Sequence, residues 1–195
     1  SHSDNDHAGG FASIVDNLPT LHIFVGEPLK SPNKSETSVI FCEAGQQWRM
    51  GQLTIDVLSP YSLTANNNNN SCVLRVTDSV HSLILTGDIE QQQELLLAKK
   101  AKHQLDSDIL FAPHHGSKYS SSEPFIRSVS PQWVVFTSGF MNRWGFPAEQ
   151  VKLRYKNQSV KMVNSGLSGF VRFTLDKEQI KIQTYREDLA SYWYH

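Results

Sequence analysis

The first ten residues concentrate side chains that can bind metal ions or transfer protons. His2, Asp4, Asp6 and His7 occur close together and are followed by a Gly-Gly pair. A carboxylate or imidazole at every second position lets alternate side chains of a loop point into one pocket, while Asp6 and His7 in succession face a neighbouring metal. The glycines permit a tight backbone turn into a helix. The spacing therefore predicts a two-metal site, whose characteristic chemistry is hydrolysis.

Two further motifs place carboxylates and imidazoles at the ends of predicted strands. Asp88 follows a Leu-Thr-Gly segment, whereas His114 and His115 follow an Ala-Pro pair and precede Gly-Ser. Thr-Gly-Asp is also a good helix cap, but two imidazoles before Gly-Ser at the end of an apolar strand are typical of a site. Ser117 can cap the next segment or contact a phosphate, and the sequence does not separate these interpretations.

Hydrophobic patterns predict alternating strands and helices, with the site motifs at strand ends. Strands are predicted over residues 21–25, 39–42, 49–58, 72–76, 82–86, 108–112 and 133–137, with a closing hairpin over 169–175 and 179–184. Helices are predicted over 9–18, 90–103 and 147–155 and from 122, with Leu95, Leu96 and Ala98 facing inward in the second. The polar segment 26–37 and the amide run 66–70 are expected to be exposed loops, because amides are costly to bury.

Composition limits the classes of fold and partner. The chain has 195 residues, 39% of them hydrophobic, so we expect one core and one domain. A formal net charge of −1 argues against binding nucleic acid through an overall positive field, so DNA contact is expected to be local. Cys42 and Cys72 are expected to be buried free thiols. No run approaches the ~20 apolar residues of a membrane-spanning helix, so the chain itself is predicted to be soluble.

The motif His-x-Asp-x-Asp-His-x-Gly-Gly resembles the metal-binding loop of the metallo-β-lactamase superfamily, with Asp4 where most members have a second histidine. Together with the motifs at 85–90 and 112–117 and Ser-Gly-Phe-Met-Asn-Arg-Trp at 138–144, it is similar to the C-terminal lactamase-like domain of the ComEC family of DNA-uptake channels. The resemblance runs from residue 1 to about residue 175. It implies an α/β fold, the metallo-β-lactamase-type αββα sandwich, over residues 1–185, with a tail over 186–195. Because members of the family have strands before their metal loop, the resemblance also implies that this domain is truncated at its N-terminus and that one edge of a sheet is open to pairing.

The resemblance implies a two-metal ligand set, comprising His2, Asp4, Asp6, His7, Asp88 and His115. The first two bind one divalent ion, and the next two bind the other together with His115. Asp88 bridges both ions, because a shared carboxylate offsets the repulsion between the cations. The set contains no thiolate, so Mn²⁺ competes with Zn²⁺ for the site. Asn70 and Ser71 either border this site or form a simple turn.

The family's activity implies a metal-dependent phosphodiesterase, with His114 and Ser117 joining Asp88 as candidate catalytic residues. His114 is expected to contact the phosphate or to protonate the leaving group. The implied partners are single-stranded DNA and the membrane channel portion of the same parent polypeptide, on the extracytoplasmic side of the inner membrane. The implied role is degradation of the DNA strand that does not enter the cell.

One departure from the family pattern weakens the implied metal site. Phe146 stands where the family commonly has a histidine before proline. Two other functions therefore compete with a nuclease, namely a catalytically impaired DNA-guiding module and a small-molecule metallo-hydrolase. Six basic side chains offer either a DNA-binding strip or an ordinary solvated face: Lys99, Lys100, Lys102, Lys118, Arg127 and Arg143.

Overall fold

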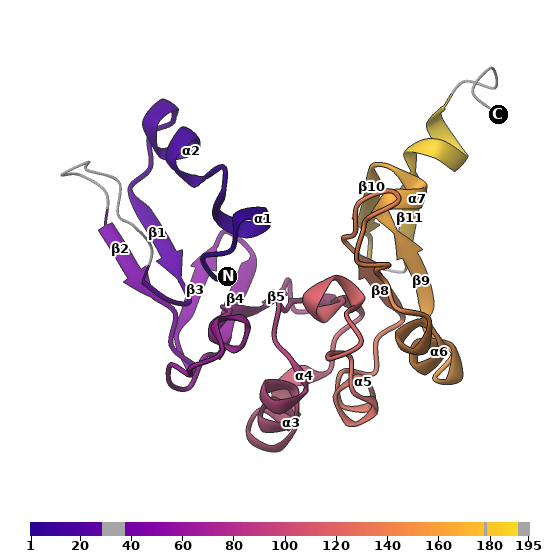
Figure 1. The fold of residues 1–195 in the computed structure, drawn as a ribbon, viewed down its shortest axis with the longest axis horizontal. Coiled ribbons are helices and arrows are strands. Elements are labelled where there is room, and N and C mark those ends of the chain that lie inside the picture. Colours follow the sequence, from indigo (N-terminus) through magenta and orange to yellow (C-terminus); the bar gives the residue numbers. More distant parts are fainter. Residues whose placement is uncertain (29–37, 178, 191–195) are drawn as a thin grey trace.

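A seven-stranded mixed sheet forms the centre of the fold (Figure 1). The computed structural model describes residues 1–28, 38–177 and 179–190. Neighbouring strands are antiparallel from β3 to β6 and parallel from β6 to β9. In spatial order, which is also chain order, they are β3 (Gln47–Met50), β4 (Leu53–Ser59), β5 (Val73–Thr77), β6 (Ser82–Leu85), β7 (Ile109–Phe111), β8 (Trp133–Phe136) and β9 (Lys161–Asn164).

Helices cover one face of this sheet. They are α3 (Gln91–Lys100), α4 (Lys102–Leu105), α5 (Glu123–Val129) and α6 (Glu149–Asn157), gathered on the same side in Figure 1. Leu97, Phe125 and Tyr155 from these helices are fully buried in one cluster with Ile84 and Val134 of the sheet. Burial of each large apolar side chain contributes about 1.5–3 kcal/mol, so this layer fixes the position of the parallel strands.

Two small sheets complete the α/β arrangement. One pairs β1 (His22–Val25) with β2 (Ser38–Phe41) in parallel, and the other is the hairpin of β10 (Val171–Leu175) and β11 (Ile180–Thr184). Phe173 and Ile182 of the hairpin pack against Ile109, Val135 and Val163 of the main sheet. The remaining elements are α1 (Asn5–Ala8), α2 (Phe11–Asn17), α7 (Ser165–Ser168) and the short turns η1 (Asn67–Asn70), η2 (Pro113–Gly116) and η3 (Tyr185–Leu189).

The parallel strands deliver the predicted site motifs to one edge of the sheet. Asp88 follows β6, the two adjacent histidines follow β7, and Thr137 follows β8. Because β6, β7 and β8 run in the same direction, these three connections lie side by side. The backbone at Gly87 lies close to Ser71 and Ser1 and has φ +55°, which favours glycine. A Cβ atom on Gly87 would lie 2.7 Å from Ser71 Cβ and 2.8 Å from Ser1 Cβ.

Two predicted elements differ from the observed ones, and one observed strand was not predicted. The predicted strand over residues 49–58 is instead a hairpin of β3 and β4, and β9 was missed because its four residues lack a clear alternation. The inward face predicted for α3 is confirmed only at Ala98, which packs against the core. Leu95 is exposed, whereas Glu94 and Leu97 are fully buried. Because α5 packs against α3, the tertiary partner selects the face. Most of the loop predicted over residues 26–37 lies outside the described residues.

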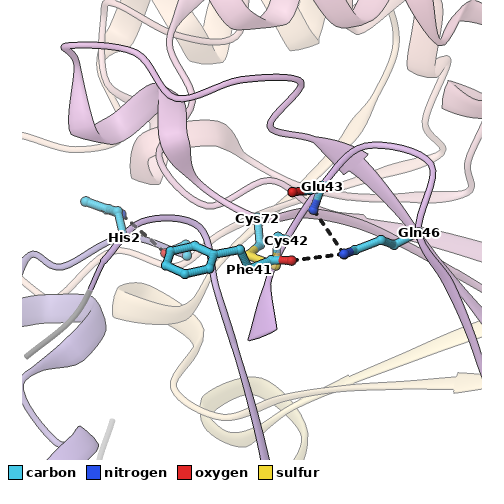
Figure 2. The surroundings of a disulfide bond; sticks show 7 residues. His2, Phe41, Cys42, Glu43, Gln46 and Cys72 are labelled. Carbon is cyan, nitrogen blue, oxygen red and sulfur yellow. Dashed lines mark hydrogen bonds between the residues drawn. A yellow bond between two sulfur atoms is a disulfide. The ribbon is translucent and has the colours of Figure 1, made fainter. Parts of the chain in front are cut away.

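The prediction of free thiols was also wrong, because Cys42 and Cys72 form a disulfide (Figure 2). Cys42 directly follows β2 and Cys72 directly precedes β5, so the bond joins the small β1–β2 sheet to the main sheet. Both residues are buried, with Val57 in the same cluster. The 30-residue separation in sequence gave no indication that the two Cα atoms lie 5.7 Å apart.

The amide run is only partly the exposed loop that the sequence predicted, because Asn66 and Asn67 are exposed but the last two amides are not. It forms η1, in which Asn69 and Asn70 are buried. Asn69 Oδ1 accepts a hydrogen bond from Glu90 N at 2.8 Å, and Asn70 Oδ1 accepts one from Thr64 N at 2.7 Å. Burial of these amides is tolerated because each has a hydrogen-bond partner from another segment.

His81 links the closing hairpin to the main sheet and makes stability depend on pH. Its Nε2 lies 2.6 Å from Asp176 O, and its Nδ1 lies 3.6 Å from Asp108 Oδ2. The hydrogen bond to Asp176 O, and then the charges of Asp108 and Asp78, raise the pKa of His81 above its usual 6.5. A raised folded-state pKa contributes stability that is full below the unfolded pKa and is lost as pH rises through the folded pKa.

We therefore expect His81→Gln to destabilise the protein at pH 5.5 and to have a smaller effect at pH 9. Urea unfolding of both proteins at the two pH values measures this difference, and the other titrating groups cancel in the comparison. An equal difference in the free energy of unfolding at both values would show that the ring acts through packing alone.

Candidate metal centre

The N-terminal loop is anchored to the body of the protein by Glu27. Ser3 donates to Glu27 Oε1 from its backbone N at 2.7 Å and from its Oγ at 2.6 Å. Asn70 Nδ2 donates to Glu27 Oε2 at 3.4 Å. Burial acts to raise the pKa of Glu27, but these hydrogen bonds outweigh it and lower the pKa. The ionised carboxylate thereby fixes the loop, and His2 within it is only 3% exposed.

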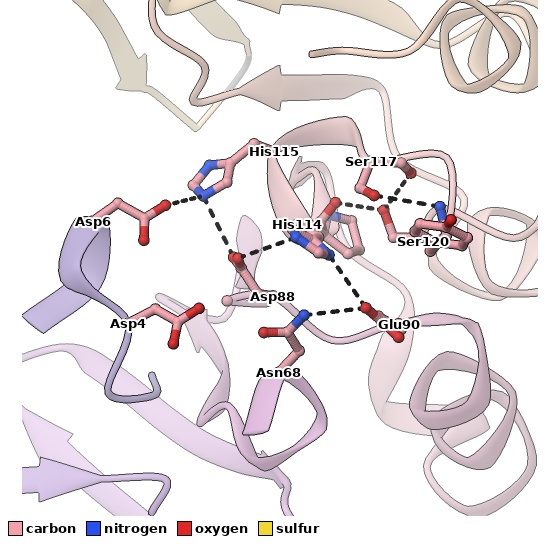
Figure 3. Close-up of polar contacts among 12 residues, drawn as sticks. Asp4, Asp6, Asn68, Asp88, Glu90, His114, His115, Ser117 and Ser120 are labelled. Carbon is pink, nitrogen blue, oxygen red and sulfur yellow. Dashed lines mark hydrogen bonds and ion pairs between the residues drawn. The ribbon is translucent and has the colours of Figure 1, made fainter. Parts of the chain in front are cut away.

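Asp88 lies at the centre of the cluster and faces four imidazoles, of which Figure 3 shows those of His114 and His115. Its Oδ1 lies 3.1 Å from His7 Nε2 and 3.6 Å from His115 Nε2. Its Oδ2 lies 4.0 Å from His2 Nε2 and 3.8 Å from His114 Nε2. The two oxygens of one buried carboxylate are therefore directed to two different groups of ring nitrogens.

Two further carboxylates lie on the outer side of the cluster. Asp4 Oδ2 is 3.5 Å from His2 Nε2, and Asp6 Oδ2 is 3.5 Å from His115 Nε2 and 3.9 Å from His7 Nε2. The side chains of Asp4 and Asp6 are 60% and 61% exposed, so they border the entrance. Donor atoms of two groups lie within 4.8 Å of one another, and these groups are His2 with His7 and Asp88, and Asp6 with His7 and His115.

The imidazoles are oriented by contacts on their outer nitrogens. His7 Nδ1 lies 2.8 Å from Ser1 Oγ, and His115 Nδ1 lies 2.9 Å from Thr137 O. Such contacts at one ring nitrogen leave the other free to bind a metal. His2 Nε2 is buried and has no hydrogen-bond partner among the described residues. A buried ring nitrogen aimed at carboxylates without a partner fits a site that binds a cation.

The pKa shifts of His2 and Asp88 are consistent with this interpretation, whereas that of His7 reflects its hydrogen bond with Asp88. Burial lowers the pKa of His2, so its ring stays neutral as a metal ligand requires. The hydrogen bond with Asp88 raises the pKa of His7. Burial acts to raise the pKa of Asp88, but the hydrogen bond with His7 and the charges of His115 and His114 outweigh it, so this pKa is lowered. The carboxylate is thus ionised where a positive charge would lie.

The backbone around the cluster is held in a specialised conformation. His114 and His115 have φ of +50° and +54°, in the left-handed region that non-glycine residues rarely adopt. The backbone N of Asp88 donates to Ser71 Oγ at 3.0 Å, so Ser71 supports the site from behind. Left-handed histidines persist where surrounding contacts enforce them, and such residues cluster at functional sites.

The structure does not bring Ser117 into the cavity beside the cluster. Its side chain is buried, and its Oγ accepts a 3.4 Å hydrogen bond from Tyr119 N within the turn that follows the histidines. In Figure 3 Ser117 lies beyond His114, beside Ser120 and away from Asp88. Of the two interpretations of Ser117, the geometry therefore favours capping, and its catalytic role stays a prediction.

The cluster opens into a cavity of about 390 Å³. Besides the carboxylates and histidines, its lining includes Thr137, Asn142, Trp144 and Phe146. The Phe146 ring meets His114 edge-on, with 5.8 Å between centroids, at the place where the family pattern suggested an imidazole. The motif at 138–144 was visible in the sequence, but nothing in it indicated that these aromatic rings border the cluster.

The predicted basic strip is not gathered at this cavity. None of the six basic side chains named for it lines the cavity, although Arg143 stacks on Trp144 at its border. Lys118 and Arg127 line a separate depression together with Arg154. Of the six basic side chains, only Arg143 is therefore placed at the border of the cavity.

The chain is similar in sequence, over nearly its whole length, to two much longer curated proteins. The chain is 35% identical over 195 residues to Recombination protein 2 of Haemophilus influenzae, covering 100% of this chain and 24% of that protein. It is 34% identical over 187 residues to Competence protein ComA of Neisseria gonorrhoeae, covering 95% of this chain and 26% of that protein. The chain thus spans about a quarter of the length of these curated relatives. No protein-family model matches the sequence.

Solved structures with the same architecture are metallo-β-lactamase-fold proteins. The fold protein YhfI of Bacillus subtilis aligns with a TM-score of 0.51 and 18% identity, over 84% of this chain and 72% of that one. A metallo hydrolase from Ignicoccus hospitalis aligns with a TM-score of 0.53 and 12% identity, over the same two shares. These likenesses confirm the predicted fold class. Within the described ranges, no helix is both long and apolar enough to cross a membrane.

Proposed function

Because the chain belongs to the ComEC family and forms its metallo-β-lactamase-like domain, we propose that it is a metal-dependent phosphodiesterase that cleaves DNA. The observation that carries the proposal is the position of Asp88, whose two oxygens face separate groups of imidazoles. One carboxylate directed to two groups of ring nitrogens is an arrangement that suits a pair of divalent cations.

The residues of the cluster divide between two metal positions. We assign His2 and Asp4 to one position and Asp6, His7 and His115 to the other, with Asp88 shared. All the donors are nitrogen or oxygen, so Mn²⁺ and Zn²⁺ are both suited to them. When bound, two such cations lower the pKa of a water molecule and neutralise charge on a phosphodiester.

DNA is the proposed substrate because of the relatives and the chemistry of the cavity. One relative is named a competence protein and another a recombination protein. His114 lies against Asp88 but outside both groups of close donor atoms, so its ring is available to contact the phosphate or protonate the leaving oxygen. In uptake, this activity would degrade the strand that does not enter the cell.

We also propose that the domain works on the extracytoplasmic side of the inner membrane, beside a channel portion of its parent polypeptide. The Cys42–Cys72 disulfide supports this placement, because disulfides persist in oxidising compartments and are rare in the bacterial cytosol. The relatives are about four times longer than this chain, which leaves room for such a portion in them.

Substrate trials with the purified chain test the proposed activity. With added Mn²⁺ or Zn²⁺, the chain is expected to cleave a labelled single-stranded oligonucleotide and to lose this activity in EDTA. Hydrolysis of a thioester or lactam without cleavage of DNA would instead identify a small-molecule hydrolase. Binding of DNA without any metal-dependent cleavage would identify a DNA-guiding module.

Substitutions of the two adjacent histidines are expected to have different effects. His115→Ala should lower the number of metal ions bound per chain, because His115 Nε2 lies within 4.8 Å of the donor atoms of Asp6 and His7. His114→Ala should reduce turnover about 10²-fold or more, as loss of an acid–base group does, with metal content near wild type. Elemental analysis beside cleavage rates distinguishes them, and loss of metal from His114→Ala but not from His115→Ala would reverse the two roles.

A further inference from the structure

Trp144 and Phe146 form an aromatic wall beside the metal cluster. Both rings line the cavity that also contains Asp4, Asp88 and His114. The two rings are stacked, with 6.4 Å between centroids and 18° between planes. Trp144 is 61% exposed, although an indole is a side chain that folding normally buries. A large exposed aromatic surface at the border of a reactive cavity is available to a ligand.

The loop that carries the aromatic wall is fixed to the cluster. Asn142 Nδ2 donates to Phe146 O at 2.7 Å and to Gly139 O at 3.0 Å, while Asn142 Oδ1 accepts from Phe146 N at 2.8 Å. At Gly116, with φ +85°, a Cβ atom would lie 2.6 Å from Pro147 Cβ. The turn η2, which contains His114 and ends at Gly116, therefore packs directly on this loop. The aromatic wall is therefore held at a set position from His114.

We propose that the aromatic wall is a stacking platform for a nucleobase of single-stranded DNA, beside the phosphate that lies at the metal cluster. This proposal rests on the proposed function and adds to it the selection of single strands. A base in a duplex is paired and stacked on both faces, whereas an unpaired base can place one face on an indole. Stacking accepts any base, so the platform would select strandedness without selecting sequence.

Arg143 adds charge to this platform. Its guanidinium carbon lies 4.5 Å from the centroid of the Trp144 ring. The side chain is exposed, so an incoming base can replace it on the indole and leave its charge for the flanking phosphate.

Binding measurements with bases present or absent test the platform without relying on cleavage. The probes are a fluorescein-labelled, phosphorothioate-linked oligodeoxythymidine that resists hydrolysis and an abasic strand of equal length, both titrated with the full chain in Mn²⁺. Trp144→Ala is expected to weaken binding of the thymidine strand about tenfold, as loss of one base–aromatic stack does. Binding of the abasic strand should stay unchanged, and Trp144→Phe should recover most of the loss.

Tyr119→Ala provides a matched control. Tyr119 is also an exposed aromatic side chain, at 60%, with Lys118 Nζ 5.0 Å from its ring centroid, but it does not line the cavity. This variant should bind both strands as the wild type does. The platform is rejected if Trp144→Ala weakens both strands equally or neither, or if Tyr119→Ala has the same effect.

Separate cleavage assays distinguish failure of the platform from failure of the proposed function. If the chain cleaves single-stranded DNA but binds it independently of Trp144, the proposed phosphodiesterase activity stands and the stacking platform is rejected. If the chain does not cleave DNA but prefers the thymidine strand through Trp144, the stacking platform stands and the proposed phosphodiesterase activity is rejected.

Discussion

Asp88→Ala is expected to abolish metal-dependent DNA cleavage, with a fall of about 10³-fold or more. The substitution removes the one carboxylate that faces both groups of imidazoles, so both metal positions lose a ligand together. Several kcal/mol of charge stabilisation are lost with the ions, and each ~1.4 kcal/mol changes a rate tenfold. Cleavage rates and metal content of the variant measure the effect.

Glu149→Ala is the matched control for this variant. Glu149 is an exposed carboxylate on α6 that pairs only with Lys152 among the described ion pairs, so its loss should leave cleavage unchanged. Thermal unfolding of both variants shows that each remains folded. If Asp88→Ala cleaves DNA at the wild-type rate, the activity arises from a contaminant, and a DNA-guiding module becomes the better account.

Removal of the disulfide is expected to lower the free energy of unfolding by about 3–4 kcal/mol, from the entropy of closing a loop of this length. The double variant Cys42→Ser/Cys72→Ser opens a 30-residue connection between the small β1–β2 sheet and the main sheet. For a chain of this size the loss corresponds to roughly 10 °C in Tm. Thermal unfolding with and without dithiothreitol provides the measurement.

The reductant supplies the control for this second prediction. Dithiothreitol should lower the Tm of the wild type by about the same amount and should leave the double variant unaffected. Equal Tm values for oxidised, reduced and variant proteins would mean that the bond is absent in solution or contributes nothing to stability.

The sequence predicts the fold best where local patterns and short motifs determine it. Apolar segments before Asp88 and before the two histidines indicate strands β6 and β7, and the parallel arrangement then brings their ends together. The α/β class follows from that alternation of strands and helices. The residue types in the N-terminal loop likewise indicate metal binding before any coordinates are known.

The features that sequence patterns missed depend on partners far along the chain. Cys42 and Cys72 approach only because β2 and β5 lie in neighbouring sheets. Asn69 and Asn70 are buried because Glu90 and Glu27 form hydrogen bonds with their amides, and a run of asparagines alone carries no sign of these partners. Leu97 faces inward instead of Leu95 because α5 packs on that side of α3.

The site shows the same division between local and distant information. The sequence motif containing Ser117 suggested chemistry, but the left-handed turn at the histidines directs its hydroxyl into the following loop. Conversely, the aromatic residue before Pro147 was noted only as a departure from a pattern, and its place beside His114 emerged from the tertiary structure. Side-chain direction at a turn depends on backbone angles that residue types do not specify.

Cleavage of an end-labelled single-stranded oligonucleotide during titration with Mn²⁺ decides whether the cluster around Asp88 is a two-metal phosphodiesterase site. We expect no cleavage by the metal-free wild-type chain, a rise in rate until two ions are bound per chain, and no cleavage by Asp88→Ala at any Mn²⁺ concentration. Cleavage that is independent of Mn²⁺, or a wild-type chain that binds two ions and leaves the oligonucleotide intact, would contradict this expectation.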